Sequence, residues 1–169
     1  ATIYYLYDNY NTKIPYYYGG SSFMEYGVSS LTGKNIPSTT YYPMPPRGYP
    51  YEYVGFDCSG FTSWAVKNGG YSIIRGNVSY FDSLAGSKNT CNITDQSCVG
   101  KPGDYVSYKG EHIKMIVKVD TTNKIYYTAE AKVAGLMVTT MGMHDAGSVP
   151  TRILHFDDFY NNSSNKKSY

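Results

Sequence analysis

Residues 57–69 read Asp-Cys-Ser-Gly-Phe-Thr-Ser-Trp-Ala-Val-Lys-Asn-Gly, and this stretch decides the predicted fold. Phe61 and Trp64 recur at the spacing of one face of an α-helix, and a glycine closes the stretch. Asp57 is of a residue type that is preferred at the N-cap of a helix. We therefore expect a buried helix that begins directly after Asp57 and holds Cys58 in its first turn.

Several short segments after this helix are rich in β-branched and aromatic residues and are bounded by turn residues. A helix followed by a run of such strands predicts an α+β fold, in which the N-terminal helix packs on an antiparallel β-sheet meander. The expected strands are Tyr105–Tyr108, His112–Val119, Lys124–Ala131, Leu136–Met141 and Arg152–Phe156.

The domain organisation follows from length and local composition. The chain has 169 residues, enough for one ordinary domain, which we expect over residues 1–160. Residues 21–56 are rich in Ser, Gly, Pro and Tyr and predict a long irregular surface segment. Residues 161–169 are polar and lack periodicity, so we expect a flexible tail or linker there.

Charge and hydropathy exclude several classes of function. Lys and Arg number 15 against 13 Asp and Glu, and no basic block marks a track for nucleic acid. No run approaches the roughly 18 apolar residues of a membrane span. The chain opens without a charged-then-apolar leader, which is typical of a processed or excised domain. Phosphate-binding and dinucleotide-binding motifs are missing from the sequence, so we expect no cofactor.

The sequence contains three cysteines, and two of them flank a short polar segment. Cys91 and Cys98 are spaced to close a small disulfide loop, and the alternative is a pair of free thiols on a surface loop. A disulfide here implies that the protein works outside the reducing cytosol. We expect no metal site, because these cysteines have no second Cys or His pair nearby to complete four ligands. His155 is interpreted as a packed or rim histidine.

The hairpin expected from residues 112–119 and 124–131 has one apolar and one polar face. The apolar faces must coincide, because a slip of one residue would turn every side chain over. This register puts Glu130, with Thr128 two residues before it, close to directly opposite His112 on the polar face. The core face is expected to hold Ile113, Met115, Val117 and Val119 in the first strand and Ile125, Tyr127 and Ala129 in the second.

Cys58, His112 and Glu130 then form a candidate set of nucleophile, general base and orienting group. A thiol at a helix N-terminus beside a histidine ionises readily, and the thiolate is the attacking form. An acceptor behind the imidazole fixes its tautomer and orientation. The alternative interpretation is a buried structural cysteine, a solvated histidine and an ordinary cross-strand glutamate.

Four motifs along the chain resemble those of the NlpC-type cell-wall cysteine peptidases, a papain-like family. They are Pro15–Gly20 with the pattern Pro-Tyr-Tyr-Tyr-Gly-Gly, Phe56–Phe61, Pro102–Asp104 and His112–Ile113. They occur in the order found in that family, and they are specific as a set although each is weak alone. The resemblance implies hydrolysis of an amide in the peptide stem of bacterial peptidoglycan, commonly the bond from a γ-linked D-glutamate to the following diamino acid.

The resemblance assigns roles by position. It makes Cys58 the nucleophile and His112 the base that later protonates the leaving amine. Tyr16 matches the family tyrosine whose hydroxyl faces the nucleophile. Backbone N–H groups around Cys58 and Ser59 are expected to bind the oxyanion, and Asp57 and Ser59 are candidates for oxyanion or substrate contacts.

The sequence departs from the family pattern at two places. The third catalytic residue of the family is a polar side chain, often histidine, whereas here we assign Glu130, with Thr128 as the alternative. Family members have a short link before the cysteine motif, so residues 21–56 form an insertion. We expect its tyrosines and prolines to make a wall of the substrate groove, and the alternative is a loop that only covers the core.

The resemblance also implies a location and a partner. We expect a secreted or cell-wall-associated bacterial protein, a monomer, whose partner is the peptidoglycan stem peptide and which acts as the catalytic module of a longer protein. One alternative is an N-acetylmuramoyl-L-alanine amidase of the related CHAP group. The other is a catalytically silent wall-binding domain that keeps the fold.

Overall fold

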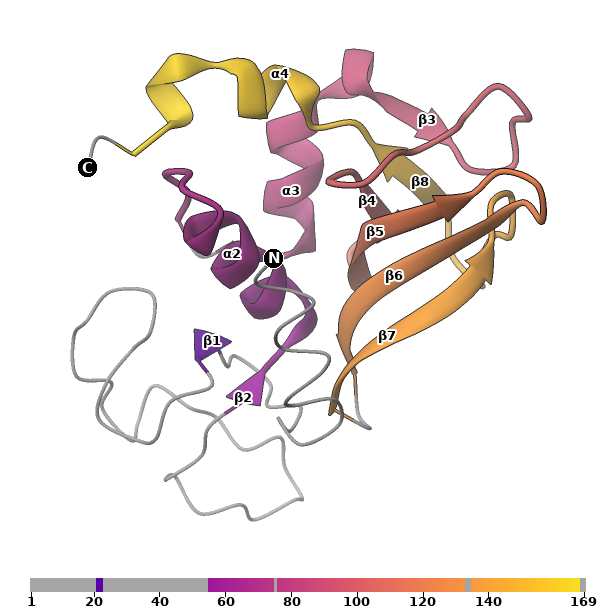
Figure 1. Ribbon diagram of the computed structural model, residues 1–169, viewed down its shortest axis with the longest axis horizontal. Helices are drawn as coiled ribbons and strands as arrows, with labels where there is room; N and C mark the ends of the chain where they lie inside the picture. Colours follow the sequence, from indigo (N-terminus) through magenta and orange to yellow (C-terminus); the bar gives the residue numbers. More distant parts are fainter. Residues whose placement is uncertain (1–20, 23–54, 75, 133–134, 168–169) are drawn as a thin grey trace.

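The computed structural model describes residues 21–22, 55–74, 76–132 and 135–167 (Figure 1). Within them, helices and strands follow one another as an α+β arrangement with a larger and a smaller sheet. The elements are β1 Ser21–Ser22, β2 Gly55–Phe56, α2 Cys58–Asn68, α3 Val78–Ala85, the 3₁₀ turn η2 Ser87–Asn89, β3 Thr90–Asn92, β4 Tyr105–Tyr108, β5 His112–Asp120, β6 Ile125–Lys132, β7 Gly135–Gly142, β8 Thr151–Leu154, α4 Asp157–Asn161 and the 3₁₀ turn η3 Ser163–Asn165.

Helix α2 begins and ends where the sequence predicts. The Asp57 side chain accepts the N–H of Gly60 at 2.6 Å, which satisfies one of the free donors of the first turn. At the other end the N–H of Gly69 donates to the carbonyl of Ala65 at 2.9 Å. Every residue from Cys58 to Val66 is buried, so the helix is held by packing around most of its surface.

The larger sheet has six strands in the order β3-β8-β4-β5-β6-β7, all paired antiparallel. Strands β4 to β7 form the predicted meander. The last predicted strand does not extend that meander, because β8 returns across the sheet and pairs with β4. Figure 1 shows α2 and α3 together on one side of this sheet, and α2 contacts β5 and β6.

Hydrophobic clusters cover both faces of the sheet, and this corrects the expectation that one face of the β5–β6 hairpin is polar. One face packs against α2 and α3, and the other carries a second cluster that includes Ile116, Val119 and Tyr126. A bulge between Ile116 and Lys118 interrupts the alternation of β5, so Val119 leaves the face on which we expected it. Tyr126, expected on a polar face, is fully buried in the second cluster.

Helix α3 is an element that the strand and helix patterns did not predict. Its N-cap is Asn77, whose side chain accepts the N–H of Tyr80 at 3.0 Å. Its buried residues include Phe81, whose ring packs against the rings of Tyr105 and Phe156.

None of the helices in the described part of the chain has the length and apolar character of a membrane-spanning helix.

The C-terminal segment that we expected as a tail is docked as far as Lys167. The N–H of Ser72 donates to the carbonyl of Asn165 at 2.6 Å, and the N–H of Lys167 donates to the carbonyl of Gly70 at 2.9 Å. These bonds attach the segment after α4 to the chain that follows α2. The polar composition of the segment hides this pairing, because the bonds use only backbone groups.

Candidate active site

Cys58 is the first residue of α2 and is 7% exposed. Its neighbours Asp57 and Ser59 are also buried, and the Ser59 hydroxyl donates to Asp57 at 3.4 Å. Asp57 therefore caps the helix and accepts a hydrogen bond from Ser59. These contacts fix the first turn, at whose N-terminal end the cysteine lies. The unpaired N–H groups of a first turn create a positive end that favours an anion there.

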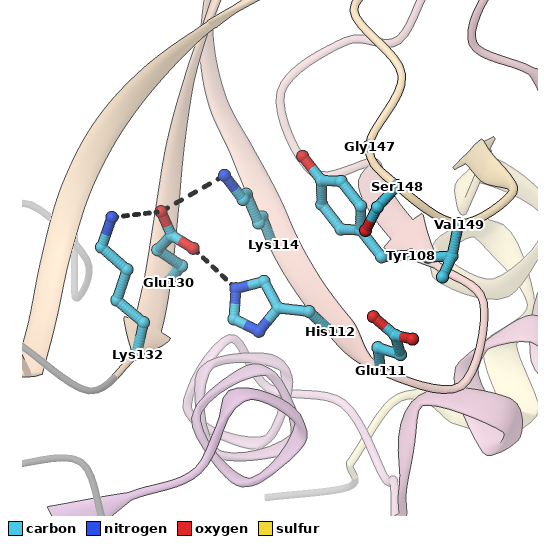
Figure 2. Close-up of a pocket in the computed structure, with 9 residues that line it drawn as sticks. All are labelled: Tyr108, Glu111, His112, Lys114, Glu130, Lys132, Gly147, Ser148 and Val149. Atoms are coloured by element: carbon cyan, nitrogen blue, oxygen red, sulfur yellow. Dashed lines mark hydrogen bonds and ion pairs between the residues drawn. The ribbon is translucent and has the colours of Figure 1, made fainter.

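His112 lies at the start of β5, and its ring joins two elements. The Nε2 atom lies 2.6 Å from Glu130 Oε2 on β6, and the other ring nitrogen is directed towards α2 (Figure 2). Burial lowers the pKa of His112, but its polar and electrostatic interactions with Cys58 and Glu130 outweigh this effect and raise that pKa to about 9. Because Glu130 occupies Nε2, Nδ1 is the ring nitrogen that remains to interact with Cys58.

Glu130 is 1% exposed, and both of its oxygens are in use. The Thr139 hydroxyl donates to Oε1 at 2.6 Å, and the ammonium groups of Lys114 and Lys132 lie 3.3 and 3.7 Å from the same atom. Burial raises the pKa of Glu130, but the hydrogen bonds from His112 and Thr139 and the charge of Lys114 lower it to about 2. The carboxylate is therefore ionised at neutral pH.

Thr128, the alternative orienting residue, is fully buried and bonds elsewhere. Its hydroxyl lies 3.0 Å from the Thr139 hydroxyl, which itself donates to Glu130. The geometry thus brings Glu130 to His112, with Thr139 behind Glu130 and Thr128 behind Thr139.

The sequence analysis missed Thr139, Lys114 and Lys132. Thr139 is the register partner of Thr128, so it lies diagonally beside Glu130 on the same face of the β6–β7 pair. Alternation along β5 and β6 puts both lysines on the face of His112 and Glu130. Strand alternation in all three strands is therefore the signal that points to these residues.

An open pocket of about 320 Å³ adjoins His112 and Glu130. Its walls include Tyr108, Glu111 and the loop residues 147–149, and the two lysines stand beside Glu130 (Figure 2). The Lys114 ammonium also lies 5.5 Å from the centre of the Tyr108 ring. The pocket gives the His112 side of the site access to solvent-borne molecules.

Other predicted residues fall in different places. Tyr16 lies outside the described residues. So do residues 23–54, which make up most of the insertion. Cys91 and Cys98 form the disulfide that their spacing suggested, and Cys58 has a free thiol. Together the described residues assemble a helix-terminal thiol, an imidazole and a carboxylate, which are the groups needed for nucleophilic catalysis.

Comparisons of the chain with protein-family models, with curated proteins and with solved structures find no match.

Proposed function

We propose that this protein is a papain-like cysteine endopeptidase that hydrolyses amide bonds in the peptide stems of bacterial peptidoglycan. One observation carries the catalytic part of the proposal: the His112 ring lies 2.6 Å from the buried carboxylate of Glu130, and its interaction with Cys58 at the start of α2 helps to raise its pKa. The substrate part rests on the four motifs that resemble the NlpC-type family.

The first step is the attack of the Cys58 thiolate on the amide carbonyl carbon. His112 accepts the thiol proton, and its pKa of about 9 favours the imidazolium at neutral pH. A C–S bond forms while the carbonyl π electrons move to oxygen. The N–H groups of Cys58 and Ser59, at the start of α2, are the backbone donors that we assign to that oxyanion.

The second step breaks the C–N bond. The His112 imidazolium gives its proton to the leaving amine nitrogen, and the acyl group stays on Cys58 as a thioester. A water then loses a proton to His112 and attacks the thioester carbon. The acid product leaves, the C–S bond breaks, and the thiolate–imidazolium pair is restored.

Glu130 is a positioning residue in this scheme. Its carboxylate accepts the Nε2 proton and so directs Nδ1 at the cysteine. Its pKa of about 2 keeps the negative charge across the working pH range, where it stabilises the imidazolium. Thr139 and Lys114 hold the second carboxylate oxygen, which limits rotation of the group.

The proposed location is the cell wall or the exterior of a bacterium. The Cys91–Cys98 disulfide supports it, because disulfides persist in oxidising environments. The bond from the γ-linked D-glutamate to the diamino acid is the proposed cleavage point, as implied by the resemblance.

The experiment is digestion of purified sacculi of the diaminopimelate and lysine types with wild type and with Cys58→Ala, followed by mass spectrometry of released fragments. We expect new amino termini on the diamino acid with wild type alone. Release of stems that begin at the first alanine would instead indicate the CHAP-type amidase. Intact sacculi that retain bound protein would overturn catalysis and indicate a wall-binding domain.

A further inference from the structure

The disulfide lies against a histidine that is distant in the sequence. Cys91 is in β3 at the edge of the sheet, and its Sγ lies 3.3 Å from Nε2 of His155, which follows β8. The pairing of β3 with β8 holds the two residues together, since Cys91 is the register partner of Ile153. The Cys91 and Cys98 sulfurs and a nitrogen of His155 all lie within 4.8 Å of one another.

The other nitrogen of this histidine is fixed by a buried carboxylate. His155 Nδ1 lies 2.9 Å from Oδ2 of Asp104, which is 1% exposed. The N–H of Lys101 donates to the same oxygen at 3.0 Å, and the N–H of Phe156 donates to Oδ1 at 3.0 Å. Asp104 is thus held in place, and it accepts from Nδ1; while the disulfide is intact Nε2 donates to the Cys91 sulfur, and loss of that proton would leave a lone pair directed at the sulfurs.

We propose that, when the disulfide is reduced, Cys91, Cys98 and His155 bind a divalent metal ion of the zinc type. Two thiolates and one imidazole are ligands that zinc prefers, at about 2.3 Å for sulfur and about 2.0–2.1 Å for nitrogen. A tetrahedron with these bond lengths separates a sulfur from a nitrogen by about 3.6 Å, close to the 3.3 Å between Cys91 Sγ and His155 Nε2. Reduction of the disulfide frees the two sulfurs to move apart to their own ligand spacing. The proposal is independent of the chemistry proposed for Cys58.

Asp104 completes the arrangement as a positioning residue. Metal-binding histidines usually donate their second N–H to a carboxylate, which raises the basicity of the ligand nitrogen and fixes the ring. His155 has this partner before any metal is present. An ordinary packed histidine beside a disulfide does not need a buried carboxylate held by backbone N–H groups.

The chemistry balances in two steps. A dithiol reductant gives two electrons and two protons to the Cys91–Cys98 bond and itself becomes a disulfide. The metal ion then displaces the proton of each thiol and binds both thiolates and the neutral His155 nitrogen, and a water or an external ligand fills the fourth position. The half-buried Cys91 and the one-third exposed His155 side chain give the ion a path from solvent.

The test uses a Cys58→Ser background, so that Cys91 and Cys98 are the only thiols. The protein is reduced with a phosphine, which does not bind the metal as a dithiol would, and is titrated with Co²⁺ without oxygen. Thiolate-to-cobalt absorption reports binding, Zn²⁺ competition gives the zinc affinity, and circular dichroism reports the fold. The matched control is His144→Ala, because His144 bonds the carbonyl of Ile93 in the same loop but is outside the cluster.

We expect the reduced protein to bind a single Co²⁺ with a thiolate absorption band, and the oxidised protein to show none. His155→Ala should lose most of the affinity, Asp104→Asn should lower it by about 10–100-fold, and His144→Ala should leave it unchanged. If reduction loosens the fold, recovery on adding metal in a His155-dependent way also supports the site. Absence of the band, or equal affinity in His155→Ala and His144→Ala, overturns the proposal.

Discussion

Glu130 reaches His112 diagonally across the β5–β6 pair. The sequence-based expectation that Glu130 lies directly opposite His112 is wrong by two residues: the register joins Met115 to Ala129, so one further step puts Glu130 opposite Lys114. The carboxylate nevertheless lies 2.6 Å from the His112 ring, because diagonal neighbours on one face remain within reach of long side chains. The same placement gives Glu130 a lysine as well as an imidazolium, which explains how a buried carboxylate stays charged.

Loss of the imidazole should remove activity but not the fold. We expect His112→Ala to lower kcat/KM by about 10³-fold or more, because general base and general acid are lost together. Activity on a soluble stem-peptide substrate measures the loss, and circular dichroism checks the fold. The control is His144→Ala, which removes a histidine that hydrogen-bonds the carbonyl of Ile93, outside the proposed catalytic set, and should retain wild-type activity. Equal activity in both variants would contradict the assignment of His112.

The choice of orienting residue predicts a ranking of two variants. Glu130→Gln should lower kcat by less than His112→Ala, since an amide oxygen still accepts the ring N–H although the negative charge is gone. Thr128→Val should change kcat less again, because Thr128 reaches Glu130 only through Thr139. Parallel kinetics of the two variants decide the order. A larger loss in Thr128→Val would mean that Thr128 orients the base.

The pKa of His112 predicts a pH dependence of stability. Its folded-state pKa is raised from 6.5 to about 9, so the imidazolium stabilises the fold fully below pH 6.5, and this contribution is lost as pH rises through about 9. The pKa of Glu130 is lowered from 4.5 to about 2, so its contribution is present above pH 4.5 and is lost as pH falls through about 2.

NMR titration of the histidine ring protons measures the first of these shifts. We expect His112 to titrate near pH 9 in wild type and lower in Cys58→Ala, because the cysteine supplies part of the upward shift. Unfolding free energies between pH 6.5 and 9 should accordingly fall more in wild type than in Cys58→Ala. An unchanged His112 titration in the variant would show that the thiol and the ring do not interact.

The disulfide should stabilise the fold modestly. It closes a loop of about eight residues, for which the loss of chain entropy in the unfolded state gives about 2.5 kcal/mol. Denaturant unfolding of the Cys91→Ser/Cys98→Ser double variant measures the difference. Non-reducing mass spectrometry should find the wild-type chain lighter than its reduced form by the two thiol hydrogens. A mass equal to that of the fully reduced chain would contradict the bond.

Substitution of Gly100 should destabilise the second hydrophobic cluster, which contains Ile116 and Ile153. A Cβ there would lie 2.5 Å from Cδ1 of Ile116 and 3.2 Å from Cγ2 of Ile153, both fully buried. We expect Gly100→Ala to lower the free energy of unfolding by about 1–3 kcal/mol through overpacking. Val99→Ala is the matched control, because Val99 is 45% exposed and should change stability by less than about 0.5 kcal/mol. Equal stability of the two variants would contradict the tight packing.

The local features of the fold were predictable because short-range rules govern them. The cap at Asp57 and the helix it begins depend on residues within one turn, and the alternation of β4 to β7 depends on adjacent residues. Two features broke the pattern. The bulge after Ile116 reversed the faces of β5, and β8 crossed to β4, and neither leaves a mark in a period-two pattern.

The sequence by itself determined that a cysteine begins a buried helix, that His112 and Glu130 share one face of a hairpin, and that Cys91 and Cys98 are spaced to pair. These relations follow from helix and strand geometry over short separations. Only the tertiary structure decided that Thr139 and Lys114 support Glu130, and that His155 and Asp104 stand beside the disulfide. The register of neighbouring strands sets the contacts of Glu130. The pairing of β8 with β3 and β4, which are distant from it in sequence, brings His155 to Cys91 and Asp104, because packing satisfies the whole core at once rather than any local pattern.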